Sequence, residues 1–276
     1  MRITYSVFLA LAGALLPFTV SPPAHAANYF VSPGGADTNP GTLEQPFATL
    51  QRAQQAARLA KGRQPVTVFL REGTYYLPET LTFTAVDSGA QAAPVAYEAY
   101  QQEQAVISGG ARLKNLKWEP HRDGIMKAQV PEAFATDQLF VNGERQPLAR
   151  YPNFNPDERI YNGYAADAIN PERAERWADP RGGFIHAMHA SMWGGFHYVI
   201  TGKDAKGNVT SEGGWQNNRP AGMHGKYRFV ENIFEELDAP GEWFLDAKTS
   251  TLYFYPPPGV DLAKATVEAC CRLCLL

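Results

Sequence analysis

The sequence predicts a mainly β protein, and three observations support this fold class. Short runs rich in β-branched and aromatic residues recur between residues 66 and 108, separated by glycine, proline and polar clusters. No helical repeat lies between these runs, which argues against β-α-β units. Asn142-Gly143 lies between strand-like flanks and is a strong hairpin signal. A β-sandwich and a stack of parallel β-helix coils both fit this pattern, and spacing alone does not separate them.

The chain opens with a pattern typical of an export signal. Arg2 gives a positive n-region, an apolar run extends from Val7 to Leu16, and Ala24-His25-Ala26 is a small-x-small cleavage site. The apolar run is shorter than the ~18 residues that a membrane-spanning helix needs, and Pro17 ends it. The sequence therefore predicts a signal peptide over residues 1–26. It also predicts a secreted or periplasmic protein with no membrane span after signal cleavage.

Composition indicates a globular domain and excludes some classes of partner. The apolar fraction of 45% and the charged fraction of 19% are ordinary for a folded protein. The formal net charge of -3 offers no basic surface to a nucleic acid. No cofactor is predicted, because neither a phosphate-binding glycine loop nor a nucleophile elbow is present. All three cysteines, Cys270, Cys271 and Cys274, lie within the last seven residues of the sequence. This arrangement does not indicate a disulfide framework.

The first segment predicts one helix among short strands. The helix is expected to begin at Pro46 and to close at Gly62. Its apolar face, at near-helical spacing, comprises Phe47, Leu50, Ala53, Ala57 and Ala60. Strands are expected over residues 28–32, 66–70, 74–77, 80–84, 95–100 and 106–108.

Three stretches of this segment carry a family resemblance. Phe30–Asp37, Gln45–Gln51 and Val68–Tyr75 resemble the opening segment and the first coil of right-handed parallel β-helix proteins of the pectate-lyase-like group. The resemblance implies that residues 27–116 form an N-terminal cap and the first β-helix coils. It also implies that the helix covers the open end of the coil stack.

The second segment predicts β-hairpins, one of them formed by Trp243–Asp246 and Thr251–Tyr255, and resembles a different domain. Phe140–Arg145, Ala149–Asn153 and Glu231–Phe244 are similar to the insertion domain of glycoside hydrolase family 141. The resemblance implies that a β-rich insertion domain over residues 117–260 interrupts the β-helix. The β-helix is then expected to resume over 261–276 and to stop in an anomalous, truncated tail.

The two resemblances together imply an exported glycoside hydrolase that acts on a polysaccharide or oligosaccharide. Such enzymes use two carboxylates across the sugar bond, and the family places them on later coils. We therefore predict that this chain is an inactive N-terminal fragment, and its catalytic residues are unknown. The alternatives are a non-catalytic carbohydrate-binding or surface-interaction β-helix protein and a polysaccharide lyase.

Candidate ligand contacts come from aromatic residues beside glycines. Flat rings suit stacking on sugars, and the candidates for substrate binding are Trp193, His197, Tyr198 and Trp215. Aromatic packing in the core of a small β-domain is the alternative explanation. No metal site is predicted, because the spacing of His186 and His189 puts them on opposite faces of a strand. The densest acidic cluster is interpreted as a charged surface and comprises Glu231, Glu235, Glu236, Asp238 and Glu242.

Overall fold

The structure of the protein is a computed structural model that describes residues 26–62, 64–132, 134–216, 219–220 and 222–270. The predicted signal peptide up to residue 25, Cys271 and Cys274 lie outside these residues. No helix in the described part is long and apolar enough to span a membrane.

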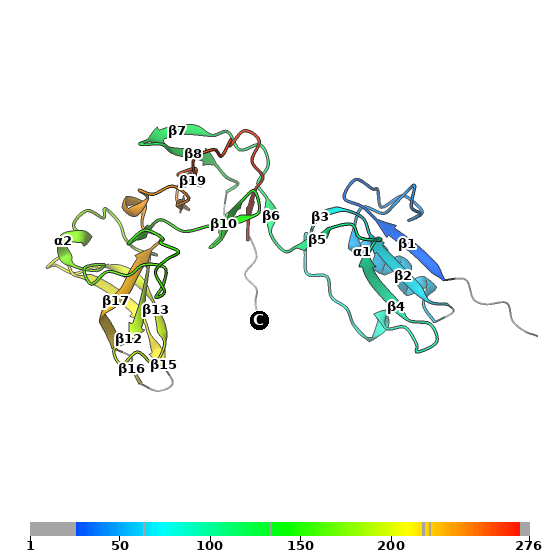
Figure 1. Ribbon diagram of the computed structural model, residues 1–276, viewed down its shortest axis with the longest axis horizontal. Coiled ribbons are helices and arrows are strands. Elements are labelled where there is room, and N and C mark those ends of the chain that lie inside the picture. The colour runs from blue at the N-terminus through cyan, green and yellow to red at the C-terminus, as the bar shows by residue number, and fades with distance from the viewer. Residues whose placement is uncertain (1–25, 63, 133, 217–218, 221, 271–276) are drawn as a thin grey trace, which may run out of the picture. The chain divides into compact units, whose positions relative to one another are not determined.

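The described chain divides into two compact units (Figure 1). The first contains residues up to Tyr75 together with Leu81–Val106, and the second contains Tyr76–Thr80 together with the residues from Ile107 on. Both are built from small sheets, so the prediction of a mainly β protein is confirmed. The described residues show no closed β-helix.

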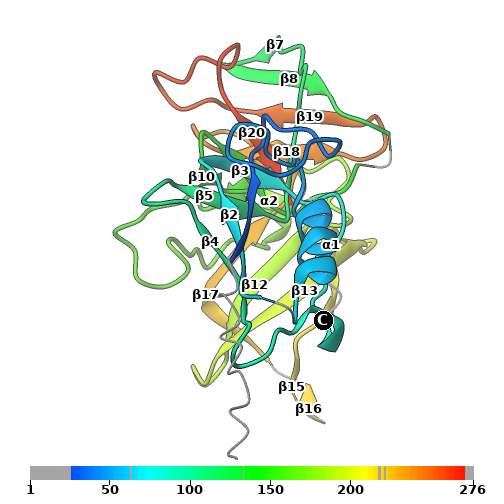
Figure 2. The ribbon, with the colours of Figure 1, turned by 90° about the vertical axis from the view of Figure 1, so that its right-hand side faces the viewer.

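The first unit is built on a parallel sheet and one helix. Strands β1 (Ala27–Val31), β2 (Val66–Leu70) and β4 (Val95–Ala99) pair in parallel in that order. Alternate residues of β2 are buried, as one covered sheet face requires. Helix α1 (Leu50–Ala60) packs against β1 and β2 (Figure 1, Figure 2). Its buried face is small because alanine supplies most of it.

The predicted start of the helix at Pro46 is wrong. The helix begins at Leu50, and Thr49 is its N-cap, with its hydroxyl accepting a hydrogen bond from the Arg52 N–H at 3.1 Å. A hydroxyl at this position satisfies a helix N–H that has no partner within the helix. Asp37 holds the residues before the helix in place, because its Oδ1 accepts from the N–H groups of Ala48 and Thr49 at 2.9 Å.

The predicted strand over residues 80–84 is not formed. This stretch leads without regular structure into the 3-10 turn η1 (Ala85–Asp87). The Asp87 carboxylate accepts the Thr84 N–H at 2.8 Å and pairs with the Arg58 guanidinium of α1 at 2.5 Å. A side chain that bonds nearby backbone stabilises a turn in competition with a strand. Strands β3 (Gly73–Tyr76) and β5 (Ala105–Ser108) form a separate two-stranded sheet.

The second unit contains two four-stranded sheets that share an apolar cluster. One has the order β10-β9-β20-β6 and the other β18-β19-β8-β7. Their strands are β6 (Ala111–Arg112), β7 (Glu119–Arg122), β8 (Ile125–Gln129), β9 (Leu139–Val141), β10 (Glu144–Gln146), β18 (Trp243–Asp246), β19 (Thr251–Phe254) and β20 (Val267–Ala269). Leu139, Trp243 and Leu252 are fully buried in the cluster between them.

The hairpin predicted at Asn142-Gly143 is confirmed. Asn142 has φ 54° and Gly143 has φ 81°, and β9 and β10 pair antiparallel across them. Two consecutive positive φ angles match the twist of the flanking strands, which explains the Asn-Gly preference. The predicted hairpin of β18 and β19 is also confirmed. Strand β20 pairs antiparallel with β9 and β6, and the resumption of β-helix coils beyond it stays a prediction.

A five-stranded antiparallel sheet completes the second unit. Its order is β11-β17-β12-β13-β14. Its strands are β11 (Arg150–Tyr151), β12 (Phe184–His189), β13 (Gly195–Lys203), β14 (Val209–Gly213) and β17 (Met223–Glu231). The short elements beside it are α2 (Pro171–Ala174), η2 (Phe234–Glu236), β15 (Trp215–Gln216) and β16 (Arg219–Pro220).

The two faces of this sheet are formed by alternate residues. The core face comprises Ile185, Ala187, Ile200 and Val230, which pack with Trp177. The pocket face carries the side chains at the intervening positions, namely His186, His197, Phe229 and Glu231. The period of two along each strand separates these two sets completely.

Candidate functional site

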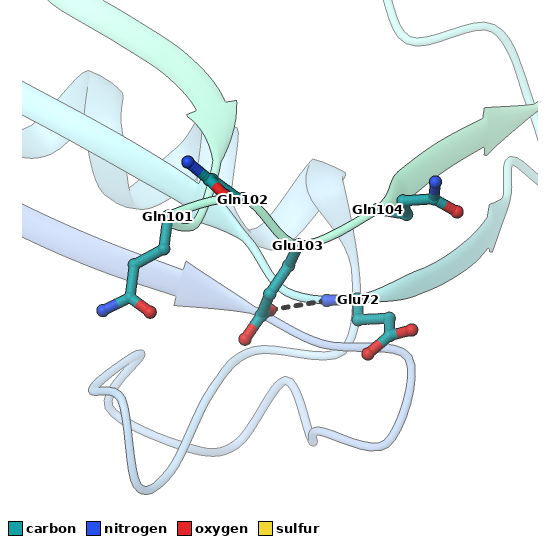
Figure 3. A pocket seen from close by; sticks show the side chains of 5 residues that line it. All are labelled: Glu72, Gln101, Gln102, Glu103 and Gln104. Carbon is teal, nitrogen blue, oxygen red and sulfur yellow. Dashed lines mark hydrogen bonds between the residues drawn. The ribbon is translucent and has the colours of Figure 1, made fainter.

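Several cavities among the described residues are large enough to hold a small ligand, with volumes of about 710, 620 and 450 Å³. The cavity of the first unit has a volume of about 710 Å³ and is lined by Glu72, Gln101, Gln102, Glu103 and Gln104 (Figure 3). All five side chains are polar, and the Glu103 carboxylate is already held by the Arg71 guanidinium and the Glu72 N–H, each at 2.8 Å. This cavity offers no ring and no free cation, so its composition favours no class of ligand.

The second cavity, which we call the sheet pocket, lies on the pocket face of the five-stranded sheet. Its volume is about 620 Å³, within the range of about 300–1,000 Å³ that is usual for small-molecule sites. It is lined by Asp137, Arg145, Gln146, Pro147, Leu148, Arg150, Phe154, Phe184, His186, His197 and Glu231. Aromatic rings, cations, carboxylates and imidazoles therefore meet in one concave surface.

Arg150 is the structural anchor of the sheet pocket. Only 4% of this residue is exposed, and its guanidinium donates to the carbonyl oxygens of Pro152, Tyr161 and Gly163 at 2.9–3.0 Å. Burial lowers the pKa of Arg150, while the negative charge of Glu231 opposes the shift. The guanidinium also lies 4.0 Å from the centre of the Phe229 ring. Arg150 thus ties the loop over residues 152–163 to the sheet.

The two histidines of the sheet pocket are connected in a line to a carboxylate. The His186 ring stacks on Phe229, with centroids 4.5 Å apart and an angle of 18°. Its Nε2 lies 2.8 Å from Oε1 of Glu231, and its Nδ1 is hydrogen-bonded to Nδ1 of His197. The pKa of His197 is lowered by burial and by the neighbouring His186, and Glu231 partly offsets this. His197 is therefore neutral over a wider pH range than an unperturbed histidine.

The four candidate ligand contacts from the sequence do not lie together. His197 lines the sheet pocket. Trp193 is 74% exposed in the turn between β12 and β13, where it stacks on His189 with ring centroids 5.0 Å apart. Trp215 is 78% exposed on β15. The role of these three side chains in binding stays a prediction.

Tyr198 lies on the opposite side of the sheet from His197. It is 7% exposed and belongs to the core cluster with Ile185 and Ile200. A Cβ at Gly214 would lie 2.2 Å from its ring, so only glycine fits beside it. Little of the Tyr198 ring is open to a ligand, and core packing accounts for this residue.

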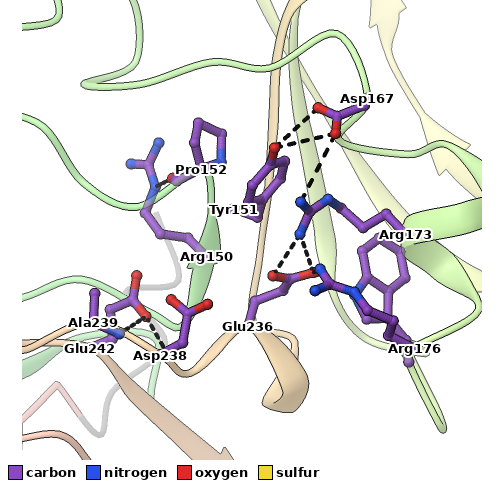
Figure 4. A network of polar contacts seen from close by, with 11 residues as sticks. Arg150, Tyr151, Pro152, Asp167, Arg173, Arg176, Glu236, Asp238, Ala239 and Glu242 are labelled. Carbon is purple, nitrogen blue, oxygen red and sulfur yellow. Dashed lines mark hydrogen bonds and ion pairs between the residues drawn. The ribbon is translucent and has the colours of Figure 1, made fainter.

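The acidic cluster is not the charged surface that the sequence suggested. Glu236 and Glu242 are each only 1% exposed. The Glu236 carboxylate accepts from Trp177 Nε1 at 2.7 Å, and Nη1 of Arg173 lies 3.0 Å from each of its oxygens (Figure 4). Arg176 adds a further contact at 3.2 Å. Glu236 can be buried because these hydrogen-bond donors and cations replace the water molecules that would otherwise solvate its carboxylate.

Glu242 is buried with fewer partners. Its Oε2 accepts the N–H groups of Asp238 and Ala239 at 3.2 and 3.3 Å, and its Oε1 has no partner among the described residues. Burial raises the pKa of Glu242 to about 8, and the charge of Asp238 adds to the shift. At neutral pH this side chain is therefore mainly the uncharged acid.

The sequence did not point to Arg150, Phe184 or Glu231 as pocket residues. They lie 34 to 81 positions apart and meet only because Phe184 and Arg150 each pair in register with Glu231 across the sheet. The local signal was the strand alternation, which shows that a strand has two faces but not which strands are neighbours.

Among the described residues, no group of three histidine, cysteine or acidic side chains is placed to hold a metal ion.

Comparisons with known proteins connect the chain to carbohydrate-active proteins. No protein-family model matches it. Pectate lyase PEL9 of Emericella nidulans is 34% identical over 165 residues, which is 56% of this chain and 35% of that protein. The uncharacterized protein YwoF of Bacillus subtilis is 40% identical over 126 residues, which is 43% of this chain and 25% of that protein. The chain thus spans about a quarter to a third of the length of these relatives.

A solved structure named glycoside hydrolase has a similar fold. Its TM-score is 0.69 at 23% identity, and the match covers 88% of this chain and 45% of that one. At this identity the likeness concerns the fold alone. Over part of its length, the chain is therefore similar to proteins that act on carbohydrates, one in sequence and one in fold.

Proposed function

We propose that this chain is the N-terminal part of an exported, polysaccharide-acting protein, a glycoside hydrolase in its complete form, and that it binds carbohydrate at the sheet pocket. The observation that carries the proposal is the pocket itself. It combines apolar rings with polar groups that are held in place by other contacts, which is the usual composition of a small-molecule site.

The fold supports the same proposal. The parallel sheet β1-β2-β4 with helix α1 beside it is the arrangement expected for the first coils and the cap of a parallel β-helix. We propose this role for the first unit, and the role of a carbohydrate-binding insertion domain for the second. Both the likeness to the solved glycoside hydrolase and the greater length of the relatives favour a piece of a larger protein. Export through the signal over residues 1–26 belongs to this proposal.

No residue of the sheet pocket is proposed as a catalytic acid or nucleophile. Hydrolysis of a sugar bond needs two carboxylates on either side of it, one of them able to donate a proton. Two carboxylates, Asp137 and Glu231, line the pocket, but Glu231 is held by His186, and the carboxyl group with the raised pKa, Glu242, does not line it. The geometry thus supports binding, and we place the chemistry of the complete protein on other residues.

The test is affinity electrophoresis of residues 27–276 in gels that contain xylan, a neutral polymer, or polygalacturonate, an acidic one. The protein should be retarded by at least one polymer and should release neither reducing ends nor unsaturated products. A double variant, Trp193→Ala with Trp215→Ala, should weaken retardation roughly threefold or more if these exposed rings stack on sugars. A folded protein that no polysaccharide retards would contradict the proposal.

A polysaccharide lyase is the second candidate, and the 34% identity to a pectate lyase favours it. A lyase removes a proton beside a uronate and leaves an unsaturated sugar, whereas a hydrolase leaves a saturated one. Retardation by polygalacturonate but not by xylan would favour the lyase. Retardation by xylan would favour the hydrolase.

A further inference from the structure

We propose that Nε2 of His197 is a hydrogen-bond acceptor for a hydroxyl group of a neutral sugar in the sheet pocket, and that the line Glu231–His186–His197 fixes it in this form. This inference rests on the proposed function and names the kind of ligand that the pocket takes. It assigns a role to two histidines and a carboxylate that the residues' local sequence does not reveal.

The position of each proton follows from the contacts. An ionised Glu231 carboxylate can only accept, so Nε2 of His186 carries a proton and donates it at 2.8 Å. A neutral imidazole has one donor and one acceptor nitrogen, which leaves Nδ1 of His186 as an acceptor. Its partner, Nδ1 of His197, must therefore carry the proton that the two rings share. The second nitrogen of His197, Nε2, is left with a lone pair.

This lone pair is available to a ligand. Among the described residues, no hydrogen bond involves Nε2 of His197, although the ring lines the sheet pocket. His186 cannot rotate to satisfy it, because its ring lies flat on Phe229, which in turn lies against the Arg150 guanidinium. A neutral acceptor held in this way suits a hydroxyl donor.

The charges around the pocket favour a neutral ligand over an acidic one. Two cations and two carboxylates line it, so their formal charges balance. The Arg150 guanidinium is occupied by three carbonyl oxygens, whereas the Arg145 side chain forms no hydrogen bond or ion pair among the described residues. The carboxylate of an anionic sugar would be repelled by the lone pair of His197 Nε2 and by the Glu231 carboxylate. The hydroxyl of a neutral sugar would not be repelled by either group.

One added proton reverses the hydrogen-bonding character of this nitrogen. When a proton binds His197, its Nε2 becomes a donor, and no heavy atom has to move. The lowered pKa of His197 keeps the acceptor form to lower pH than an ordinary histidine would. Affinity for the neutral sugar should therefore be constant at neutral pH and fall on acidification.

The titratable and charged groups that face His197 from the surrounding elements are His186, Glu231, Arg150, Asp137, Arg145, Tyr161 and, on β14, Glu212.

The test measures binding and the position of the protons on the same protein, residues 27–276. Titration calorimetry with xylohexaose should give about five- to tenfold weaker binding for His197→Ala, the effect of losing one hydrogen bond. Glu231→Gln should weaken binding by a smaller factor, because an amide no longer fixes the proton on His186. His121→Ala is the matched control, since this exposed histidine on β7 does not line the pocket. Nitrogen-15 NMR of the imidazoles should show His197 protonated at Nδ1 and unprotonated at Nε2 at neutral pH.

Each outcome separates this inference from the proposed function. If wild-type protein and His197→Ala bind xylohexaose equally, sugar binding stands and the role of His197 is overturned. A protonated Nε2 in the wild-type protein at neutral pH overturns it as well. Tighter binding of hexagalacturonate than of xylohexaose, increasing on acidification, would show that His197 acts as a donor to a uronate. If the folded protein binds neither oligosaccharide, the proposed function fails, and the inference fails with it.

Discussion

Alternate residues of the same strands form the core face and the pocket face of the five-stranded sheet, but different interactions hold the two faces. On the core face, Ile185 and Ile200 are 1% exposed and are stabilised by burial in an apolar cluster. On the pocket face, the neighbouring Val199 is 45% exposed and the His186 side chain 14% exposed, and rings and hydrogen bonds fix the polar groups. One face thus contributes stability, and the other is free to present chemical groups.

The same contrast appears between carboxylates. Glu236 lies against the core side and is surrounded by arginine and tryptophan donors. Glu231 lies on the pocket face, is 22% exposed at its side chain and has one imidazole partner. Glu242 is as buried as Glu236, but it accepts backbone N–H groups and forms no ion pair among the described residues. These carboxylates thus differ in their partners and not only in their burial.

The largest expected effect is the loss of the core-side carboxylate. Glu236→Ala leaves Arg173 Nη1 and Trp177 Nε1 without their acceptor, and the free energy of unfolding should fall by about 3–5 kcal/mol. Urea unfolding followed by tryptophan fluorescence measures it. Glu235→Ala is the control, because Glu235 accepts one backbone N–H, from Ala178, and its loss should cost only about 1 kcal/mol. Equal losses for the two variants would show that the network around Glu236 is not stabilising.

Truncation of a side chain on the core face should have the next largest effect on the free energy of unfolding. Ile200→Ala removes a buried side chain and leaves a cavity, so the free energy of unfolding should fall by about 2–5 kcal/mol. Affinity for a sugar should not change in the variant that remains folded, since Ile200 does not line the sheet pocket. The two measurements are urea unfolding and calorimetry. A loss of affinity without a loss of stability would mean that the two faces are not independent.

Glu242 should make stability depend on pH. Its pKa of about 8 in the folded protein exceeds its ordinary value of 4.5, so between these values the folded state binds more protons than the unfolded state. The free energy of unfolding should therefore decrease as pH rises through this window, by about 1.4 kcal/mol per pH unit, and level off above it. Urea unfolding at several pH values checks this. In Glu242→Gln the decrease should disappear, and an unchanged slope would assign it to other groups.

A substitution on the pocket face should have the smallest effect on the free energy of unfolding. Val199 is 45% exposed next to the buried Ile200, and Val199→Thr should change the free energy of unfolding by no more than about 0.5 kcal/mol. Thermal and urea unfolding beside Ile200→Ala give the comparison directly. A loss of similar size in both variants would show that the pocket face is covered in solution.

Local features were predictable because local forces determine them. The hairpin at Asn142-Gly143 needs two positive φ angles, and asparagine and glycine are residue types that favour such angles. The body of helix α1 followed from its apolar spacing, whereas its start at Leu50 depended on the hydroxyl cap of Thr49 and on Asp37, which lies 12 residues before Thr49. The strand expected over residues 80–84 failed because Asp87 bonds Thr84 and Arg58.

The sequence by itself therefore determined the mainly β class, the hairpins and a set of aromatic and histidine candidates. Only the tertiary structure decided that Tyr198 belongs to the core and that its neighbour His197 lines the sheet pocket together with His186 and Glu231. The physical reason is register. Alternation along one strand shows that two faces exist, but the pairing of distant strands decides which side chains share a face and which face is buried.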